Sequence, residues 1–146
     1  MTMNLIPGVE STGSALSAEK IRLEVIAQNI ANPNTTQAAS GKVYQRKEVA
    51  FEEFIKNPSR RTPGYVDENL YQGVRVVDVY DDQTPGRMIF NPGHPHANKD
   101  GMVEMPNVDV SREMIDLISA SRAYEANLSV VKTSRRMAQQ ALAIGR

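Results

Sequence analysis

The sequence predicts a mainly α-helical protein with a small β domain, an α+β fold in which N- and C-terminal helices pair antiparallel around an inserted antiparallel β unit. Apolar residues recur at helical spacing near both ends of the chain, over about residues 11–31 and 111–144. The residues between them are divided into short strand-like segments by Pro-Gly dipeptides. Of the 146 residues, 40% are hydrophobic and 23% are charged, which is typical of a globular protein.

The first helix is predicted to run from a serine at position 11, 14 or 17 to about Ala31, after a flexible start over residues 1–10. A serine hydroxyl at any of these positions could accept a hydrogen bond from the first free amides of the helix. Its apolar stripe consists of Leu16, Ala18, Ile21, Leu23, Val25, Ile26 and Ile30. The helix should end at Asn32-Pro33-Asn34, because Pro33 has no amide hydrogen and restricts the residue before it.

The middle of the chain reads as short strands separated by turns. The strand candidates are residues 43–51, 73–80, 87–90 and 102–105. Turns are expected at the dipeptides Pro63-Gly64, Pro85-Gly86 and Pro92-Gly93, and residues 57–64 read as an exposed basic loop. We expect one small antiparallel β unit, too small to be stable without the helices.

The second helix is predicted over residues 111–144, a stretch that contains neither proline nor glycine. Pro106 closes the β unit, and Asn107, Asp109 or Ser111 can cap the helix. A helix of this length extends roughly 50 Å, more than one compact domain of this size can cover. It therefore needs further partners along its length.

Two apolar seams run along this second helix at heptad spacing. The first seam consists of Met114, Leu117, Ser121, Tyr124, Leu128, Val131, Ala138 and Leu142. The second seam consists of Ala120, Ala123, Asn127, Val130, Ser134, Met137, Ala141 and Ile144. One partner helix covers one seam, so two seams indicate two neighbours. The alternative is an ordinary bundle helix with one broad apolar face.

Composition and charge argue against several classes of protein. Seventeen basic and seventeen acidic residues cancel, which argues against nucleic acid as a partner. Without cysteine the chain has no disulfide, thiolate metal site or cysteine nucleophile. The first residues have no basic region followed by an apolar stretch, so we expect no cleavable signal peptide. No apolar run approaches the roughly 18 residues of a membrane span, so we expect no membrane insertion.

The sequence offers few candidates for catalysis or metal binding. His94 and His96, with Asp100 and Glu104, are the one cluster that suggests a metal, but two histidines around a proline are better explained by a rigid surface turn. Nothing resembles a nucleophile elbow or a phosphate-binding glycine loop. We therefore expect neither enzyme activity nor a cofactor.

The chain ends carry motifs of a known family. Two segments together resemble the terminal signatures of the bacterial flagellar rod, hook and filament axial proteins: residues 14–32 and residues 113–127. The most characteristic part of the first signature is Asn29-Ile-Ala-Asn32 with Thr35-Thr36. The middle and the length resemble the proximal rod members of that family. The segments that carry this closer resemblance are residues 44–47, 91–98, 101, 105–110 and 141–146. Pro33 stands where the family usually has alanine, and Met102 where an aromatic residue is common.

The resemblance implies a discontinuous helical inner domain from residues 1–36 and 107–146, and a small outer β domain from residues 37–106. It implies a structural subunit of the proximal rod, assembled helically into the periplasmic drive shaft that transmits torque and encloses the export channel. The implied partners are copies of itself, proximal rod neighbours, the rod–ring adaptor, the distal rod and the flagellar type III export apparatus. Two alternatives stay open: another axial protein, from a different rod segment or the hook junction, and a soluble helical adaptor or export chaperone.

The expected interface residues lie on both helices. Leu16, Leu23, Ile26 and Ile30 are predicted to pack against Leu117, Tyr124, Leu128 and Val131 within one subunit, leaving the second seam for neighbours. Asn127 is expected to specify register, as a polar residue does at a coiled-coil core position. The complete expected set is Leu16, Leu23, Ile26, Asn29, Ile30, Asn32, Met114, Leu117, Ala120, Ala123, Tyr124, Asn127, Leu128, Val130, Val131, Met137 and Ala141.

Overall fold

The computed structural model describes residues 7–38, 41–55 and 71–144. Its elements, in chain order, are α1 (Pro7–Ala31), β1 (Lys47–Ile55), β2 (Tyr71–Asp81), β3 (Met88–Phe90), β4 (Met102–Glu104) and α2 (Val110–Ile144). The predicted fold class is confirmed: two long helices pack together, and small antiparallel sheets lie between them in the sequence. The predicted flexible residues 1–6 and the exposed loop at 57–64 lie outside the described residues.

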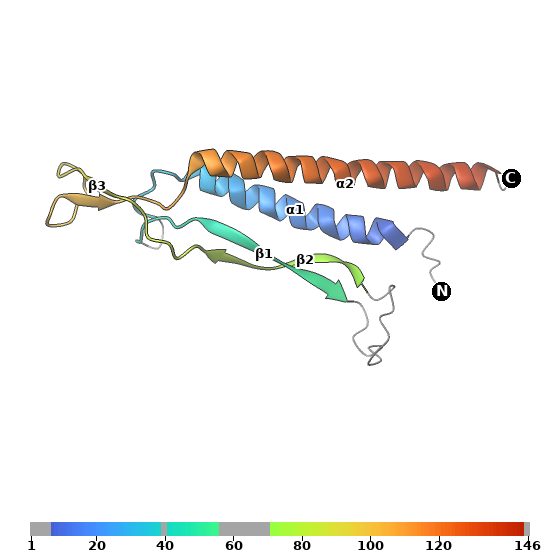
Figure 1. Cartoon of the computed structure of the whole chain (residues 1–146), viewed down its shortest axis with the longest axis horizontal. Coiled ribbons are helices and arrows are strands. Elements are labelled where there is room, and N and C mark those ends of the chain that lie inside the picture. Colours follow the sequence, from blue (N-terminus) through green and yellow to red (C-terminus); the bar gives the residue numbers. More distant parts are fainter. Residues whose placement is uncertain (1–6, 39–40, 56–70, 145–146) are drawn as a thin grey trace.

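The molecule is elongated, with the two helices antiparallel and side by side (Figure 1). The β1–β2 ribbon lies along the other side of α1, so α1 is the middle of three layers. The β3–β4 hairpin projects beyond the end at which α1 finishes and α2 begins, while the last turns of α2 extend past the start of α1. The described strands form two separate sheets, where one unit was expected. The division into inner and outer domains stays a prediction.

Helix α1 begins earlier than predicted, at Pro7. Proline suits a first helical position because the amide hydrogen it lacks has no partner there. The prediction of a flexible start is therefore wrong for residues 7–10, and the serines are not caps. Ser17 donates from its hydroxyl to the Gly13 carbonyl (3.2 Å) and Ser14 to that of Ser11 (2.7 Å), as serines inside a helix do. The predicted end at Ala31 is confirmed.

Glycine 13 lies inside α1, exposed, with nothing within 4 Å of the position that a Cβ would take. A Gly13→Ala substitution removes conformational freedom from the unfolded chain and adds no clash. We expect it to raise the free energy of unfolding by about 0.5–1 kcal/mol, measured by urea unfolding followed by far-UV circular dichroism. An unchanged or lower stability would contradict an exposed helical position at Gly13.

Strand β1 starts four residues later than predicted, at Lys47 and not at Val43. The residues before it, including Tyr44 and Arg46, are used in polar contacts with α1 and α2 that are described below. β1 pairs antiparallel with β2, with Val49 opposite Val79 and a register shift between Ala50 and Phe51. Strands β2, β3 and β4 lie within two residues of their predicted bounds.

The ribbon is attached to α1 at Gly73. The Ser14 hydroxyl accepts a hydrogen bond from the Val74 amide at 3.1 Å. A Cβ on Gly73 would come within 2.0 Å of the Ser14 hydroxyl oxygen, and Gly73 has a φ of 147°. Glycine therefore permits both the backbone conformation and the close approach of β2 to the helix.

Helix α2 starts at Val110 and is capped by Asp109, one of the three predicted candidates. The Asp109 carboxylate accepts a hydrogen bond from the Ser111 amide at 2.9 Å. The described core is thin. Its buried apolar residues are Ala18, Val25, Ile26, Val103, Val108 and Ala120. The largest fully buried side chains are polar, Glu113 and Asn29. Polar contacts as well as apolar packing therefore hold the elements of this fold together.

Candidate subunit interface

Both helices carry a buried alanine on the faces that pack together. Ala120 of α2 is fully buried, and Ala18 of α1 is 4% exposed. Small side chains let helix backbones approach each other, and larger ones fill the space beside them. The residues predicted to pair across the helices are buried or half-buried: Leu16, Leu23, Ile26, Ile30, Leu117, Tyr124, Leu128 and Val131.

The two predicted seams do not separate into one inner and one outer face, which corrects the expectation. In the second seam, Ala120 is fully buried while Ile144 is 85% exposed. In the first seam, Met114 is 54% exposed although Leu117 is half-buried. A straight helix of 3.6 residues per turn rotates by about 20° per heptad, so a heptad seam moves gradually around it. Each seam therefore contains both buried and exposed residues, and the exposure of Ile144 also reflects the absence of α1 beside the last turns of α2.

Most apolar residues near the end of α2 have no cover among the described residues. Val130, Met137 and Ile144 follow one another at intervals of seven, and all three are exposed, as is Ala141. The second helix has 35 residues and the first has 25, so about 15 Å of α2 extends beyond α1. Ala123 and Asn127, of the same seam, are half-buried.

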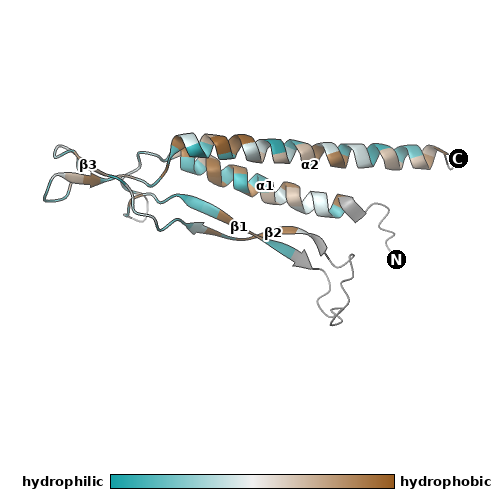
Figure 2. Cartoon of the chain, in the orientation of Figure 1, coloured by the Kyte–Doolittle hydropathy of each residue, from teal (hydrophilic) through white to brown (hydrophobic). Residues whose placement is uncertain are grey.

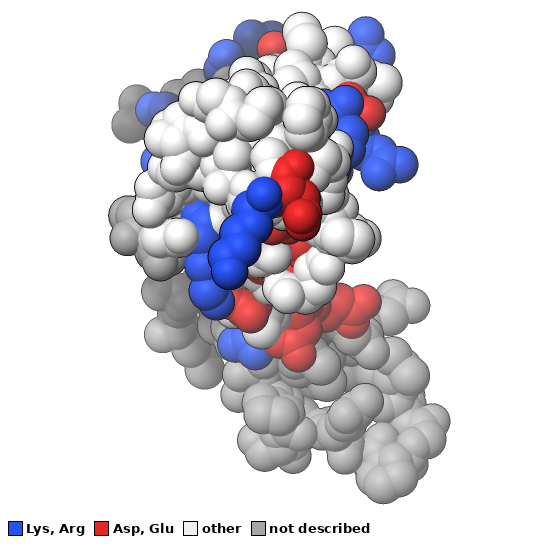
Figure 3. Space-filling view, turned by 90° about the vertical axis from the view of Figure 1, so that its left-hand side faces the viewer, with Lys and Arg blue, Asp and Glu red and all other residues white. Residues whose placement is uncertain are grey.

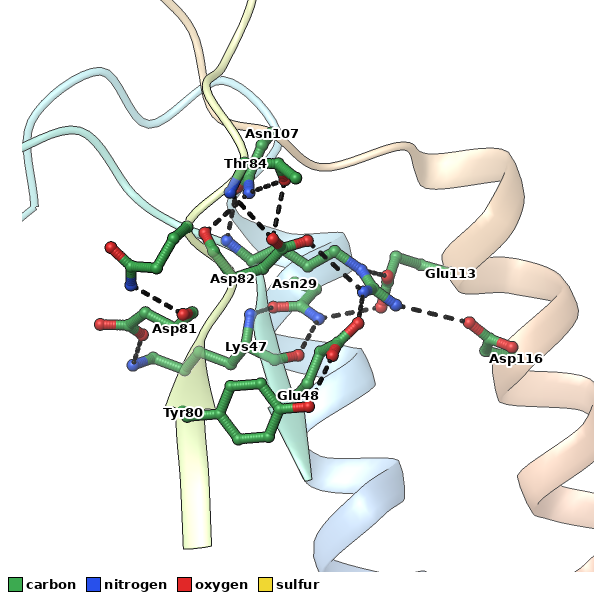
Figure 4. Close-up of polar contacts among 12 residues, drawn as sticks. Asn29, Lys47, Glu48, Tyr80, Asp81, Asp82, Thr84, Asn107, Glu113 and Asp116 are labelled. Carbon is green, nitrogen blue, oxygen red and sulfur yellow. Dashed lines mark hydrogen bonds and ion pairs between the residues drawn. The ribbon is translucent and has the colours of Figure 1, made fainter. Parts of the chain in front are cut away.

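A buried polar cluster joins the two helices to β1 near the other end of the pair (Figure 4). The Arg46 guanidinium donates from Nε to Oε1 of Glu113 at 2.6 Å, and the Asn29 amide donates to Oε2 at 2.9 Å. Glu113 is fully buried and Asn29 is 1% exposed. The Asn29 oxygen also accepts hydrogen bonds from the Tyr44 hydroxyl and the Lys47 amide, both at 2.9 Å. We call Asn29, Tyr44, Arg46 and Glu113 the polar junction.

Further contacts extend this junction to the connection between β2 and α2 (Figure 4). Asn107 accepts a hydrogen bond from the Arg46 amide at 2.7 Å and donates to the Asp82 carbonyl and the Thr84 hydroxyl, both at 3.0 Å. The Arg46 guanidinium also pairs with Glu48 and approaches Asp116 at 3.7 Å. One arginine thus contacts β1, α2 and the segment before α2.

Two groups of the polar junction, Arg46 and Tyr44, have raised pKa values. Burial lowers the pKa of Arg46, but hydrogen bonding and attraction from Glu113, with Glu48, raise it above its ordinary value. Burial raises the pKa of Tyr44, and the charges of Asp81 and Glu113 raise it further, so its hydroxyl stays a donor. Hydrogen bonds from the Thr84 amide and hydroxyl lower the pKa of Asp82. The raised pKa values favour a charged Arg46 and a Tyr44 hydroxyl that keeps its proton.

Two predicted interface residues have intramolecular roles. Asn29 is too buried to meet a partner, and it belongs to the polar junction. The side-chain amide of Asn32 donates a hydrogen bond to the Gln28 carbonyl at 2.8 Å, and its side-chain oxygen accepts one from the Thr35 hydroxyl at 3.0 Å. These two bonds cap the end of α1. The sequence reasoning missed Arg46 and Glu113. One signal for Glu113 was available: it lies seven residues before Ala120, which places this charged residue on the same face of the helix as a predicted contact residue.

The His94-Pro-His96 segment is a turn, as predicted. The His94 amide donates to the Asn91 carbonyl at 3.1 Å, and the Ala97 amide donates to that of His94 at 3.0 Å. His96 Nδ1 lies 2.8 Å from the Thr36 hydroxyl. Among the described residues, no three histidine or acidic side chains come together as metal ligands would. None of the described helices combines the length and apolar character that crossing a membrane requires.

Comparison with known proteins gives matches over both ends and over the whole chain. The family profile described as "Flagella basal body rod protein" matches residues 10–38, and that described as "Flagellar basal body rod FlgEFG protein C-terminal" matches residues 99–144. The flagellar basal-body rod protein FlgC of Borreliella burgdorferi is 39% identical, over 97% of this chain and 98% of that protein. FlgC of Yersinia enterocolitica is 40% identical over 98% and 99% of the two chains, and FlgC of Bacillus subtilis is 34% identical over 99% and 100%. The similarity therefore spans the helices and the strands between them.

Proposed function

Because the chain belongs to the FlgC family of flagellar basal-body rod proteins, we propose that its copies assemble helically into the proximal segment of the periplasmic rod. The chain is a structural subunit of the basal-body rod, in a family that is not enzymatic. The observation that supports helical assembly is the exposed stripe of Val130, Met137 and Ile144 on a helix that outruns its partner. Apolar surface of this kind is stabilised when a neighbouring subunit covers it.

In this proposal the helices form the wall of a tube that encloses the export channel, and the tube transmits torque. The polar junction supports the second role, because it ties α1, α2 and β1 through short hydrogen bonds. A load on the helices would pass to the ribbon through these contacts. Buried, well-paired polar groups hold a single geometry more strictly than apolar contacts do.

We assign copies of the chain, proximal rod neighbours, the rod–ring adaptor and the distal rod as partners, and the flagellar type III apparatus as the export route. These assignments rest on the family. The alternative of a soluble adaptor or export chaperone is set aside, because relatives that match almost their whole length are rod proteins. The same relatives are FlgC proteins, which disfavours another rod segment or a hook-junction component.

A Met137→Asp substitution tests the assembly surface. It places a charge in the exposed apolar stripe, so we expect the tagged variant to be lost from isolated basal bodies and swimming to be abolished. Because Met137 is 62% exposed, the thermal midpoint of the purified variant should be unchanged. Gln139→Asp is the matched control, since Gln139 is exposed, belongs to neither predicted seam and lies about 200° around the helix from Met137. Normal incorporation of the Met137→Asp variant would remove this surface from the proposal.

An Asn127→Leu substitution tests the register role. Asn127 is half-buried on the side of α2 that faces α1. We expect the variant to keep or raise its helical content, because leucine is the better core residue, and to impair rod assembly through loss of register. Circular dichroism and motility in soft agar measure the two effects. Normal motility of this variant would refute the role.

A further inference from the structure

Burial is concentrated in one half of the helix pair. The junction half, as we call residues 25–31 of α1 and 113–120 of α2, contains these buried residues: Val25, Ile26, Asn29, Glu113 and Ala120. In the far half, residues 9–19 and 121–144, Ala18 is the one buried residue that the structure describes. Hydrophobic residues are also densest near the start of α2 (Figure 2). The helices therefore pack better beside the polar junction than away from it.

A charged residue interrupts the apolar stripe of α1 in the far half. Glu19 follows Leu16 by three residues and precedes Leu23 by four, so the three side chains share one face of the helix. The two leucines are half-buried, and the Glu19 side chain is 18% exposed. Its Oε2 atom is buried and has no hydrogen-bond partner among the described residues. Nη1 of Arg22 lies 3.8 Å from this oxygen, which is too far for a hydrogen bond.

Glu113 shows how a buried carboxylate is satisfied in the junction half. Arg46 and Asn29 donate hydrogen bonds to its two oxygens at 2.6 Å and 2.9 Å. Basic and acidic side chains also adjoin on the surface at this end of the molecule (Figure 3). A carboxylate without such donors opposes burial, because it has left water without gaining equivalent hydrogen bonds. The pairing of α1 with α2 is therefore weakened at Glu19 and reinforced at Glu113.

We propose that α1 and α2 open locally from the end remote from the polar junction, and that Glu19 is the residue that sets this weak point. In the open state the Glu19 carboxylate returns to water, while Asn29 and Arg46 keep their hydrogen bonds to Glu113. The junction half stays closed and the far halves of the two helices separate. Local opening of this kind occurs where a structure buries the least apolar surface.

The opening bears on assembly, and this step rests on the proposed function. The free chain pairs the far half of α2 with its own α1, whereas a subunit inside a rod has further neighbours. A pair that opens readily lets the chain pass from the first set of contacts to the second. Removing the weak point should therefore favour the closed free chain over the assembled one.

Amide hydrogen exchange of the purified full chain, followed by mass spectrometry, tests the weak point. Glu19→Leu should slow exchange over residues 121–131 by about 5–30-fold and raise the thermal midpoint by about 3–8 °C. Glu19→Gln removes the charge and keeps the size of the side chain, so it should give a smaller change in the same direction. Glu24→Leu is the matched control, since Glu24 is 59% exposed on the same helix and should leave both quantities unchanged. No slowing with Glu19→Leu, or slowing with leucine and none with glutamine, overturns the role of the carboxylate.

Tyr44→Phe separates local opening from opening of the whole pair. It removes the 2.9 Å hydrogen bond from the Tyr44 hydroxyl to Asn29, whose oxygen still accepts one from the Lys47 amide. We expect faster exchange in the junction half and unchanged exchange over residues 121–131, because the polar junction is intact before and after local opening. Equal acceleration in both halves overturns the proposal, since the pair would then open as one unit.

Incorporation into rods measures the consequence for assembly. Tagged Glu19→Leu chain, expressed beside the untagged wild type, should enter basal bodies several-fold less than tagged Glu24→Leu chain. Equal incorporation of the two variants overturns the link between opening and assembly. Absence of tagged wild-type chain from basal bodies overturns the rod function itself, on which the exchange measurements of the free chain do not depend.

Discussion

Replacing Arg46 with methionine is expected to lower the free energy of unfolding by about 3–5 kcal/mol. Glu113 is fully buried, and its two hydrogen-bond partners in the described structure are Arg46 and Asn29. Without the guanidinium, its carboxylate remains in the core with a single neutral donor, and an unpaired buried charge is among the most destabilising changes known. Urea unfolding followed by circular dichroism measures the loss.

Removing the other partner, with Glu113→Leu, should lower the free energy of unfolding by less, because Arg46 has further acidic neighbours. Three other carboxylates lie near the Arg46 guanidinium: Glu48, Asp82 and Asp116. Its positive charge therefore keeps acidic neighbours when Glu113→Leu removes one carboxylate. The double variant Arg46→Met/Glu113→Leu leaves no buried charge, so we expect it to be more stable than Arg46→Met alone. Additive losses in this cycle would contradict a coupled ionic pair.

A Gly86→Ala substitution is expected to destabilise the protein by about 1–3 kcal/mol or more. A Cβ at this position would lie 1.8 Å from the Met105 carbonyl oxygen and 3.0 Å from its carbonyl carbon. Both are backbone atoms, next to the hydrogen bond from the Met105 amide to the Arg87 carbonyl (2.8 Å). A side-chain rotation therefore cannot relieve the clash, and the backbone has to move. The base of the β3–β4 hairpin must open to admit the methyl group.

Gly13→Ala is the matched control, since it makes the same chemical change at a position with open space around it. The two variants should therefore shift the urea midpoint in opposite directions. Amide hydrogen exchange should rise in β3 and β4 of the Gly86→Ala variant and stay unchanged in its helices. If Gly86→Ala left the free energy of unfolding unchanged, the chain between β2 and β3 would not pass this close to Met105.

The helices and three of the four strands could be predicted because their signals are local. The end of α1 follows from Pro33, and the cap of α2 from Asp109, whose carboxylate reaches an amide two residues later. Strands β2 to β4 follow from short segments rich in apolar residues that turn residues separate. Residues 43–51 alternate loosely, yet Tyr44 and Arg46 bond to Asn29 and Glu113, which are distant in sequence, and the strand begins after them.

The candidate surface was less predictable for two physical reasons. The partner of a buried charge depends on which segments meet in space, so nothing in the sequence connected Arg46 to Glu113, 67 positions away. The heptad pattern could not show that α1 stops short of the end of α2, which leaves Ile144 exposed although Ala120 of the same seam is buried. Exposure of Ile115 and Ile118 follows from the position of α1, which covers one side of α2 only.

The two ends of α2 differ in how they are covered. The polar junction fixes the ribbon to one end of the helix pair, where Glu113 and Asn29 are buried. The opposite end of α2 extends beyond α1 and exposes apolar surface. The polar contacts that fix the fold and the surface that we propose for assembly therefore lie at different ends of α2.

Deletion of the gene in its source organism, followed by electron cryotomography of the basal bodies, tests the rod assignment most directly. If the chain is a proximal rod subunit, we expect membrane rings with no rod beyond its base in the deletion strain, and a complete rod after the gene is restored. A deletion strain with a complete rod and hook would contradict it.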